Sequence, residues 1–463
     1  MQRTEEPEKQ YRRMLNEPIG KLILQMALPM VVSMLITVIY NTADTYFVSQ
    51  INKSASAAVG AVYSVMAILQ AVGYGLGMGS GSLISRALGQ KRSELAQKYA
   101  SSAFFLALLL GGLLGAAGLS VLRPMLRLLG CSETMLPYAV DYAKYILMAA
   151  PISCSVFVLN NTCRAEGEAM LSMWGMGIGG GLNLVLDPIF IFRLGLGAGG
   201  AALATAVSNG VSFVIFLFFF LSGRSALRIR LRSVSRKLSD YWLIFSTGLP
   251  TVCRQGLGSL ASALLNIQAV VYGDAAVSAV TIANKVYVLV RNLVLGVGQG
   301  FMPVAGYNYG AGDRCRTWRA FSFTAKVGTA VCLAFAALSY GFAEPIMAWF
   351  SSDAEVIAIG VQTLHFAAAV MPFMAVSTYV NQLYQALGFR VQATFLASCR
   401  QGVFFVPAIL LLPVFYHCVG VEAAQPAADF LTFFVAAAFL IVFYRKEFRN
   451  SVKNAKGESY GKS

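Results

Sequence analysis

The sequence predicts an all-α integral membrane protein in which twelve transmembrane helices form two pseudo-symmetric six-helix bundles. The first observation is composition, because 57% of the 463 residues are hydrophobic and only 12% are charged. No water-soluble domain could cover that much apolar surface. The second observation is an internal repeat, since the chain matches itself without a gap when it is displaced by 221 residues. The matched residues mostly shape the backbone and include Pro29/Pro250, Gly75/Gly296, Gly77/Gly298, Gly79/Gly300, Gly89/Gly310, Pro151/Pro372, Asn160/Asn381 and Gly167/Gly388.

Each half of the repeat contains six apolar runs near or above the ~20 residues that cross a bilayer as a helix. In the first half they are expected at 22–48, 56–85, 99–122, 137–160, 170–193 and 198–222. In the second half they are expected at 240–272, 276–305, 318–343, 356–384, 391–416 and 420–444. The predicted division is a polar tail at 1–18, an N-terminal lobe at 19–223, a basic linker at 224–239, a C-terminal lobe at 240–444 and a basic tail at 445–463. Such duplicated bundles are typical of transporters, whose two halves rock around a site between them.

The net charge of +15 is unevenly distributed along the chain. If the N-terminus is inside, the loops on the opposite side carry only Lys53, Arg123, Arg127 and Arg193. This asymmetry follows the positive-inside rule, so both termini are expected in the cytoplasm. The linker is expected near anionic lipid headgroups rather than on nucleic acid. Residues 1–18 mix acids and bases, which predicts a retained tail and not a cleaved signal.

Cysteines and histidines give no sign of a metal or redox site. The eight cysteines lack CxxC spacing, and the two histidines, His365 and His417, are far apart in the sequence. We therefore expect no cofactor and no resident metal. A membrane enzyme such as an acyl or glycosyl transferase would need catalytic acids, histidines or a metal motif on a polar loop. The predicted outer loops are short and poor in such groups, so we expect a protein that is not an enzyme.

Two acidic residues fall inside the apolar runs of the first half. An acid near the bilayer centre costs about 2.5 to 3.5 kcal/mol, so such residues usually have a function. Asp44 follows Tyr40 by four residues and Asp187 follows Asn183 by four, which puts each pair on one helical face. Pro188 is expected to bend the helix beside Asp187. If the carboxylates meet, they could bind and release a proton or a sodium ion. The alternative is that Asp44 lies near the end of its span and faces water.

The second half departs from the first at these positions. The repeat partners of Asp44 and Asp187 are Leu265 and Ala408, so ion binding is expected only in the first half. The second half instead places basic residues in its spans, with Asp429 as a possible counter-charge. They are Arg254, Lys285, Arg291 and Arg400. Residues Asn284, Tyr287 and Arg291 are expected on one face of the eighth span.

Four segments resemble the MATE (multidrug and toxic compound extrusion) transporters. They are Gly296–Gly310 (GVGQGFMPVAGYNYG), Tyr40–Asp44 (YNTAD), Ile84–Gly89 (ISRALG) and Leu186–Pro188 (LDP). The likeness extends over essentially the whole chain beyond the tail and looks closest to the DinF-like branch, which couples through the N-terminal lobe. The NorM-like branch uses a carboxylate in the seventh span, where this chain has CRQG at 253–256 and no acid.

The resemblance implies a MATE/MOP-like fold in which two bundles expose a central cleft to each side in turn. Ion entry would drive export of amphipathic, cationic organic compounds by antiport with H⁺ or Na⁺. The implied cation-coupling residues are Tyr40, Asp44, Asn160, Asn183, Asp187 and Thr205. Candidates for lining the substrate cleft are Met34, Phe157, Met173, Asn284, Tyr287 and Arg291.

We expect a multi-pass protein of a bacterial inner membrane, in contact with lipid and a small organic substrate. The sequence does not define its oligomeric state, and a monomer is the expectation. The main alternative is a flippase of the same superfamily that moves lipid-linked saccharides or other anionic substrates. Such a protein would be expected to show a cleft dominated by basic residues, whereas this chain has basic residues in one half only.

Overall fold

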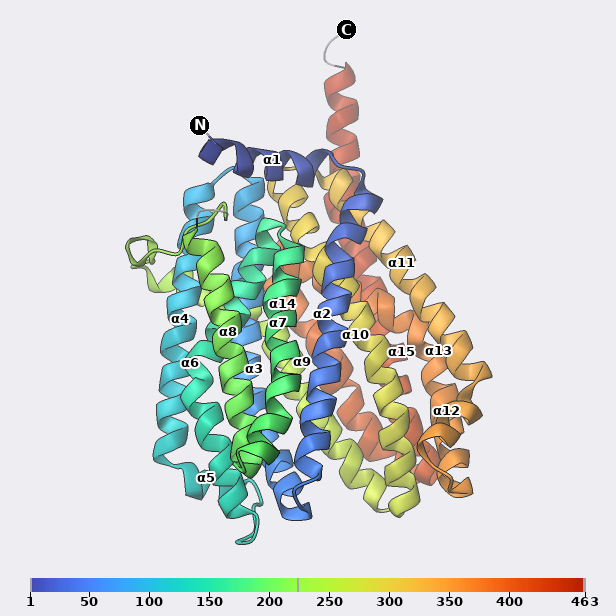
Figure 1. Ribbon diagram of the computed structural model, residues 1–463. Coiled ribbons are helices and arrows are strands. Elements are labelled where there is room, and N and C mark those ends of the chain that lie inside the picture. Colours follow the sequence, from blue (N-terminus) through green and yellow to red (C-terminus); the bar gives the residue numbers. More distant parts are fainter. Residues whose placement is uncertain (1, 223–224, 461–463) are drawn as a thin grey trace.

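The computed structural model describes residues 2–222 and 225–460. Arg224, which begins the predicted linker, and the last three residues of the predicted tail, 461–463, lie outside the described residues. Side chains are described from Glu8 to Glu447, except in the gap. In this part of the chain every regular element is helical, and long helices stand side by side along one axis (Figure 1).

The first half contains six long helices. The sequence of elements is α2 (Ile19–Ser49), α3 (Lys53–Gly89), α4 (Ser93–Ser120), the short α5 (Leu122–Leu128), α6 (Leu136–Glu166), α7 (Ala169–Pro188) and α8 (Gly197–Leu221). A π-helical turn, η1 (Ile189–Arg193), follows Pro188 and continues α7. Pro188 therefore marks the change of helix type beside Asp187, as its missing backbone donor predicts.

The second half repeats this order after the linker, which contains a 3₁₀ turn, η2 (Leu231–Ser233). Its elements are α9 (Leu238–Val270), α10 (Asp274–Gly310), α11 (Arg314–Gly341), the short α12 (Ala343–Phe350), α13 (Ala354–Leu387), α14 (Arg390–Ser398), the π-helical η3 (Cys399–Val403) and α15 (Phe405–Tyr460). Within α15 the chain reverses at His417, whose φ is 51°. Gly420 then packs against the backbone of Leu412, so α15 contains two antiparallel helices.

Ten stretches in the described residues are long and apolar enough to cross a membrane. One of them, Arg390–Glu447, contains the reversal at His417 and thus provides two spans. The remaining span is α9, which has sufficient length with 33 residues but also contains charged residues such as Asp240 and Arg254. The prediction of twelve helices in two bundles, the N-lobe (α2–α8) and the C-lobe (α9–α15), is confirmed.

Equivalent hydrogen bonds in the two lobes show that the sequence repeat is also a structural one. Asn160 Nδ2 donates to the carbonyl oxygen of Ser172 at 3.1 Å. Asn381 Nδ2 donates to the carbonyl oxygen of Ala393 at 2.6 Å. Each bond joins two consecutive helices across a turn that begins with a left-handed glycine. The repeated glycines, Gly167 and Gly388, thus allow turns that place these amides against the next helix.

The two lobes approach each other through glycines of α3 and α10. A Cβ atom on Gly79 would lie 2.2 Å from the carbonyl oxygen of Ile244 in α9. At the repeat partner, Gly300, a Cβ atom would lie 2.5 Å from Cα of Ala27 in α2. Only glycine permits such contact, because the missing side chain lets the backbones meet. The pseudo-twofold relation between the lobes therefore extends to the interface that joins them.

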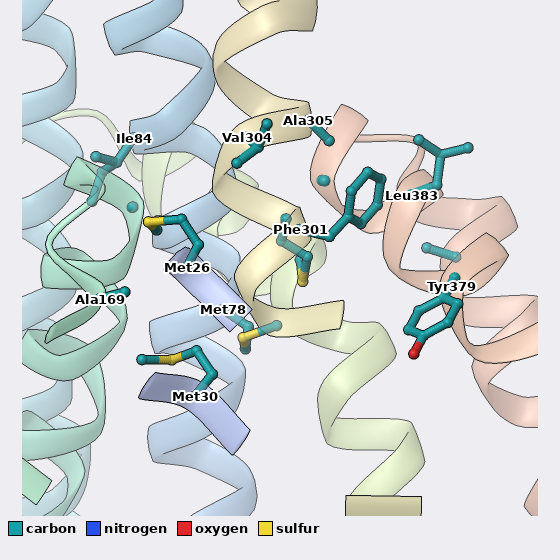
Figure 2. Close-up of a cluster of buried hydrophobic side chains, with 14 of the residues drawn as sticks. Met26, Met30, Met78, Ile84, Ala169, Phe301, Val304, Ala305, Tyr379 and Leu383 are labelled. Carbon is teal, nitrogen blue, oxygen red and sulfur yellow. The ribbon is translucent and has the colours of Figure 1, made fainter. Parts of the chain in front are cut away.

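Buried methionine and aromatic side chains fill the space around these glycines. Figure 2 shows Met26 and Met30 of α2 beside Met78 of α3, with Phe301 of α10 and Tyr379 of α13 on the other side. All five belong to one continuous apolar cluster with residues from both lobes. The core thus crosses the lobe boundary instead of stopping at it.

Helix α1 (Gln2–Asn16), formed by the predicted polar tail, lies across one end of both lobes (Figure 1). Its Gln10 side chain donates to the carbonyl oxygen of Glu166 in the N-lobe at 3.2 Å. Asn308 of the C-lobe donates to the carbonyl oxygen of Met14 at 3.3 Å, and the Met14 side chain is fully buried. We call this the α1 end of the molecule.

Hydrogen bonds that join the lobes lie close to the α1 end in the described part of the chain. Ser82 Oγ donates to the carbonyl oxygen of Gln385 at 2.7 Å, and Arg86 Nη1 donates to that of Leu387 at 3.0 Å. Arg164 of the N-lobe donates to Gln299 of the C-lobe. Farther from α1, by contrast, Tyr63 of α3 is 55% exposed. The lobes are therefore fastened together at the α1 end.

Candidate functional site

A polar cluster lies in the interior of the N-lobe around the two predicted carboxylates. Asp187 at the end of α7 has no exposed surface. Asn183, one turn earlier, donates through Nδ2 to Asp187 Oδ1 at 3.1 Å and is 3.3 Å from Thr205 Oγ1 of α8. The spacing of four residues thus places Asn183 and Asp187 on one face, as predicted, and α8 supplies the neighbouring hydroxyl group.

Asp44 joins this cluster from α2 through a residue that sequence reasoning missed. The hydroxyl group of Tyr142 in α6 donates to Asp44 Oδ2 at 3.4 Å. Tyr142 is completely buried and also interacts electrostatically with Asp187 and Tyr40. Tyr142 is therefore bonded to Asp44 and within electrostatic range of Asp187. The N-lobe carboxylate cluster consists of Tyr40, Asp44, Tyr142, Asn183, Asp187 and Thr205.

Three oxygen atoms of this cluster are buried and accept no hydrogen bond from the described part of the chain. They are Asp44 Oδ1, Asn183 Oδ1 and Asp187 Oδ2. Buried acceptors without a donor are destabilising, so such atoms call for an explanation. A proton on a carboxylate would turn an acceptor into a donor. A sodium ion, as a hard cation that prefers oxygen ligands, could instead be held by these oxygens. In the described residues no group of three or more His, Cys, Asp or Glu side chains is placed to hold a metal ion.

The C-lobe contains a different set of charges. Arg400 in η3 donates through Nε to Asp429 Oδ1 of α15 at 2.5 Å. Tyr287 of α10 donates to the other oxygen of Asp429 and lies under the Arg400 guanidinium, 5.6 Å from the ring centroid. Asp429 is thus the counter-charge that the sequence suggested, and its partner is Arg400. Arg254 and Arg291 form no ion pair within the described residues.

Comparison with known proteins identifies the family. A family model described as MatE matches residues 29–189 and again residues 250–410. The two matches begin 221 residues apart, as the internal repeat does, and together cover more than half of the chain. The chain belongs to the MATE family. It is a multi-pass membrane transporter and not an enzyme.

Relatives cover almost the whole chain. A protein of Staphylococcus haemolyticus named multidrug export protein MepA is 26% identical over 436 residues, which are 93% of this chain and 94% of the relative. An outward-facing multidrug resistance MATE transporter of the MOP superfamily matches with a TM-score of 0.90 and 26% identity, covering 94% of this chain and 98% of the other. A MOP superfamily transporter from Pyrococcus furiosus matches with a TM-score of 0.86 and 27% identity, covering 92% of this chain and 96% of the other. Its structure is described as having a binding pocket of reverse polarity that suggests a different function.

One residue that the MATE resemblance assigned to the carboxylate cluster lies elsewhere. Asn160 in α6 is level with Ser172 of α7, to which it donates two hydrogen bonds. Ser172 precedes Asn183 by eleven helical residues, so Asn160 lies about 16 Å from Asn183 along the helix axis. Asn160 Oδ1 accepts from Arg164 Nη2 at 2.7 Å instead. The structure therefore brings Asn160 to the lobe interface and not to the carboxylates.

The candidates for lining a MATE substrate cleft have different surroundings. Met34 of α2, Met173 of α7 and Asn284 of α10 are half-buried. Phe157 of α6 packs against Tyr74 with the ring centroids 4.2 Å apart. Tyr287 is buried and bound to Asp429 and Arg400. Arg291 is half-buried, with its Nε atom fully enclosed.

Proposed function

We propose that this MATE transporter exports amphipathic organic compounds by antiport with H⁺ or Na⁺, and that the coupling ion binds at Asp44 and Asp187. The observation that carries this proposal is the N-lobe carboxylate cluster, in which both acids have a buried oxygen without a donor. The corresponding positions of the C-lobe are Leu265 and Ala408, so the second lobe has no equivalent site. The relative named as a multidrug export protein supports export as the direction and a broad substrate range.

Coupling would operate through the hydrogen bonds of the cluster. Protonation of Asp44 or Asp187, or Na⁺ binding between them, changes which groups can donate and accept around Tyr142 and Asn183. These residues come from α2, α6 and α7, so the change reaches three helices of the N-lobe. Export follows if the ion-bound lobe favours the state with low substrate affinity, because an ion can shift a conformational equilibrium only by its different affinities for the two states.

The orientation that we propose is that the α1 end faces the cytoplasm of a bacterial cell. The positive-inside distribution of lysine and arginine supports it. The lobes are fastened at the α1 end, so in this orientation the conformation is closed toward the cytoplasm. The likeness to an outward-facing MATE structure agrees with this assignment.

Half-buried methionine and aromatic side chains support amphipathic substrates. Aromatic rings can stack on organic cations and methionine adapts to different shapes. Organic cations are thus the first class to test, with Met34, Phe157, Met173, Asn284, Tyr287 and Arg291 as proposed cleft residues. A second candidate is a flippase for an anionic substrate, which the unpaired Arg254 and Arg291 favour.

Gradient-driven uptake into inside-out vesicles tests the proposed function. The dye is tetramethylrhodamine methyl ester, an organic cation, and a proton gradient and a sodium gradient are imposed separately. We expect one gradient to drive uptake by the wild type and Asp44→Asn to reduce it to the level of empty vesicles. The matched control is Asp141→Asn, which removes an exposed acid paired only with Lys144. Equal uptake by wild type and Asp44→Asn would contradict the proposed ion site.

A further inference from the structure

Positive charge is in excess in the interior of the C-lobe. Arg254 lies near the middle of α9, Arg291 near the middle of α10, and Arg400 in η3. The three arginines interact electrostatically with one another, and Asp429 interacts with two of them, Arg291 and Arg400. Charges inside a membrane protein are costly unless they are paired or serve a function.

The carboxylate of Asp429, which pairs with Arg400, is already used. Asp429 accepts from Arg400 Nε at 2.5 Å and also accepts the Tyr287 hydroxyl group. Gln425 donates to the same carboxylate at 3.2 Å. Three neighbours therefore saturate Asp429, and Arg400 with Asp429 forms a self-contained pair. The charges of Arg254 and Arg291 remain uncompensated.

One buried donor atom of each of these two arginines has no acceptor in the described part of the chain. Nη1 of Arg254 and Nε of Arg291 are enclosed and unbonded. Nη2 of Arg254 reaches only Thr251 Oγ1, at 3.5 Å. A packing role would not explain two like charges with free donors, because each unpaired buried donor destabilises the fold. The free donors indicate an acceptor that is not part of this chain.

The two arginines distinguish the C-lobe from the N-lobe. The residues that occupy the equivalent positions in the N-lobe are Ser33 for Arg254 and Gln70 for Arg291. The fold therefore does not require a cation at either place, since the other lobe adopts it with neutral residues. The charges must have a role that belongs to the C-lobe alone.

Arg291 is also within electrostatic range of the opposite lobe. It interacts electrostatically with Tyr63 of α3, and Tyr63 in turn interacts with Tyr40 beside Asp44. Tyr63 is 55% exposed, so its ring presents an open apolar surface. A molecule held by Arg291 would therefore meet aromatic side chains of the N-lobe on its other side. This combination of guanidinium groups and aromatic rings suits a compound with one acidic group and an apolar body.

We propose that Arg254 and Arg291 bind the acidic group of an amphipathic organic anion, such as a carboxylate, sulfonate or phosphate. This proposal rests on the proposed transport function and adds a second substrate class, organic anions, to the organic cations named above. Guanidinium groups match these anions because their planar donors form paired hydrogen bonds with two oxygens. The anion can come from a water-soluble compound or from the headgroup of a lipid, which offer the same chemistry.

Direct binding of two dyes tests the site without transport. Fluorescein is an anion and tetramethylrhodamine methyl ester a cation, and both have a xanthene ring. Fluorescence anisotropy with the full-length protein in zwitterionic nanodiscs gives the dissociation constants. We expect Arg254→Gln and Arg291→Gln each to weaken fluorescein binding roughly tenfold or more, the loss typical of a hydrogen bond to a charged group. The cation should bind these variants as well as it binds the wild type, or more tightly.

Two controls separate loss of the site from loss of the fold. Lys285→Gln removes one positive charge from an exposed position of α10 and should leave fluorescein binding unchanged. Arg254→Lys and Arg291→Lys keep the charge and should weaken binding by less than the glutamine variants. Fluorescein binding that is unaltered in both glutamine variants, or equally weakened by Lys285→Gln, would overturn the proposal.

Two further arms identify the source of the anion and keep the two proposals apart. Adding phosphatidylglycerol to the nanodiscs displaces fluorescein if a lipid headgroup occupies the site, and has no effect if the site takes soluble anions.

Asp44→Asn should bind fluorescein like the wild type, because it alters the other lobe. If arginine-dependent binding is present but no gradient drives transport, the ion-coupled function fails and the anion site stands. If transport is gradient-driven but fluorescein binding does not depend on Arg254 and Arg291, the anion site fails and the ion-coupled function stands.

Discussion

The hydroxyl group of Tyr142 donates to Asp44 across 3.4 Å and links α6 to α2 in the interior of the N-lobe. The other oxygen of Asp44 accepts no hydrogen bond from the described residues. Tyr142 also interacts with Asp187, so a single phenol is close to both proposed ion-binding acids. Under the proposed function, Tyr142 would respond to which carboxylate holds the ion.

Replacing Tyr142 with Phe should weaken coupling without removing either acid. The variant loses one hydrogen bond of about 1 kcal/mol, which corresponds to roughly fivefold in ion affinity. We expect the ion concentration needed for half-maximal uptake to shift by about that factor. The control is Tyr138→Phe one turn earlier, where the hydroxyl group bonds only with Asn52 at an exposed site. If the ion concentration for half-maximal uptake is the same in Tyr142→Phe as in the wild type, Tyr142 has no part in ion coupling.

Two glycines of α3 should respond to alanine with opposite signs. At Gly79 a Cβ atom would lie 2.2 Å from the carbonyl oxygen of Ile244, so Gly79→Ala forces the lobes apart and should destabilise the protein by about 1 to 3 kcal/mol. At Gly60 a Cβ atom meets nothing within 4 Å, so Gly60→Ala should stabilise the helix by up to about 1 kcal/mol. Thermal unfolding of the purified variants measures both. A higher Tm for Gly79→Ala would contradict the close lobe contact.

Cys315 reports which side of the membrane the α1 end faces. It is exposed at the start of α11, whereas five of the other cysteines are buried and two are partly covered. We expect a membrane-impermeant maleimide to label the wild type in inside-out vesicles and not in intact cells, because the proposed orientation is cytoplasmic. Cys315→Ser should remove the signal. Labelling of intact cells that is lost in Cys315→Ser would show that the α1 end faces outward and contradict the proposed orientation.

Much of the fold could be predicted because its causes are local in the sequence. Apolar runs determine the spans, and pairs such as Gly79/Gly300 reveal the repeat. The helical state of the first residues was not predicted, since residues 1–18 lack an apolar run. Helix α1 depends on tertiary contacts, such as the bond from Asn308 to the Met14 carbonyl oxygen.

The candidate site could be predicted only in part. Asp44 and Asp187 were evident because acids are rare in apolar runs. Tyr142 gave no such signal, since tyrosine is common in membrane helices and its partner lies in another helix. Asn160 matched the family pattern by residue type. Its side chain instead bonds α6 to α7, and Asn381 makes the equivalent bond in the C-lobe. Residue type alone does not define depth along a helix.

Asp187→Asn in proteoliposomes tests the central claim most directly, because it separates coupling from substrate movement. Two rates are measured for one labelled substrate: accumulation driven by an ion gradient, and exchange between equal substrate pools without any gradient. We predict that the variant loses accumulation and keeps exchange, since the proposed ion site lies in the N-lobe and the substitution leaves the proposed substrate path intact. Gradient-driven accumulation equal to that of the wild type would contradict ion coupling through Asp187.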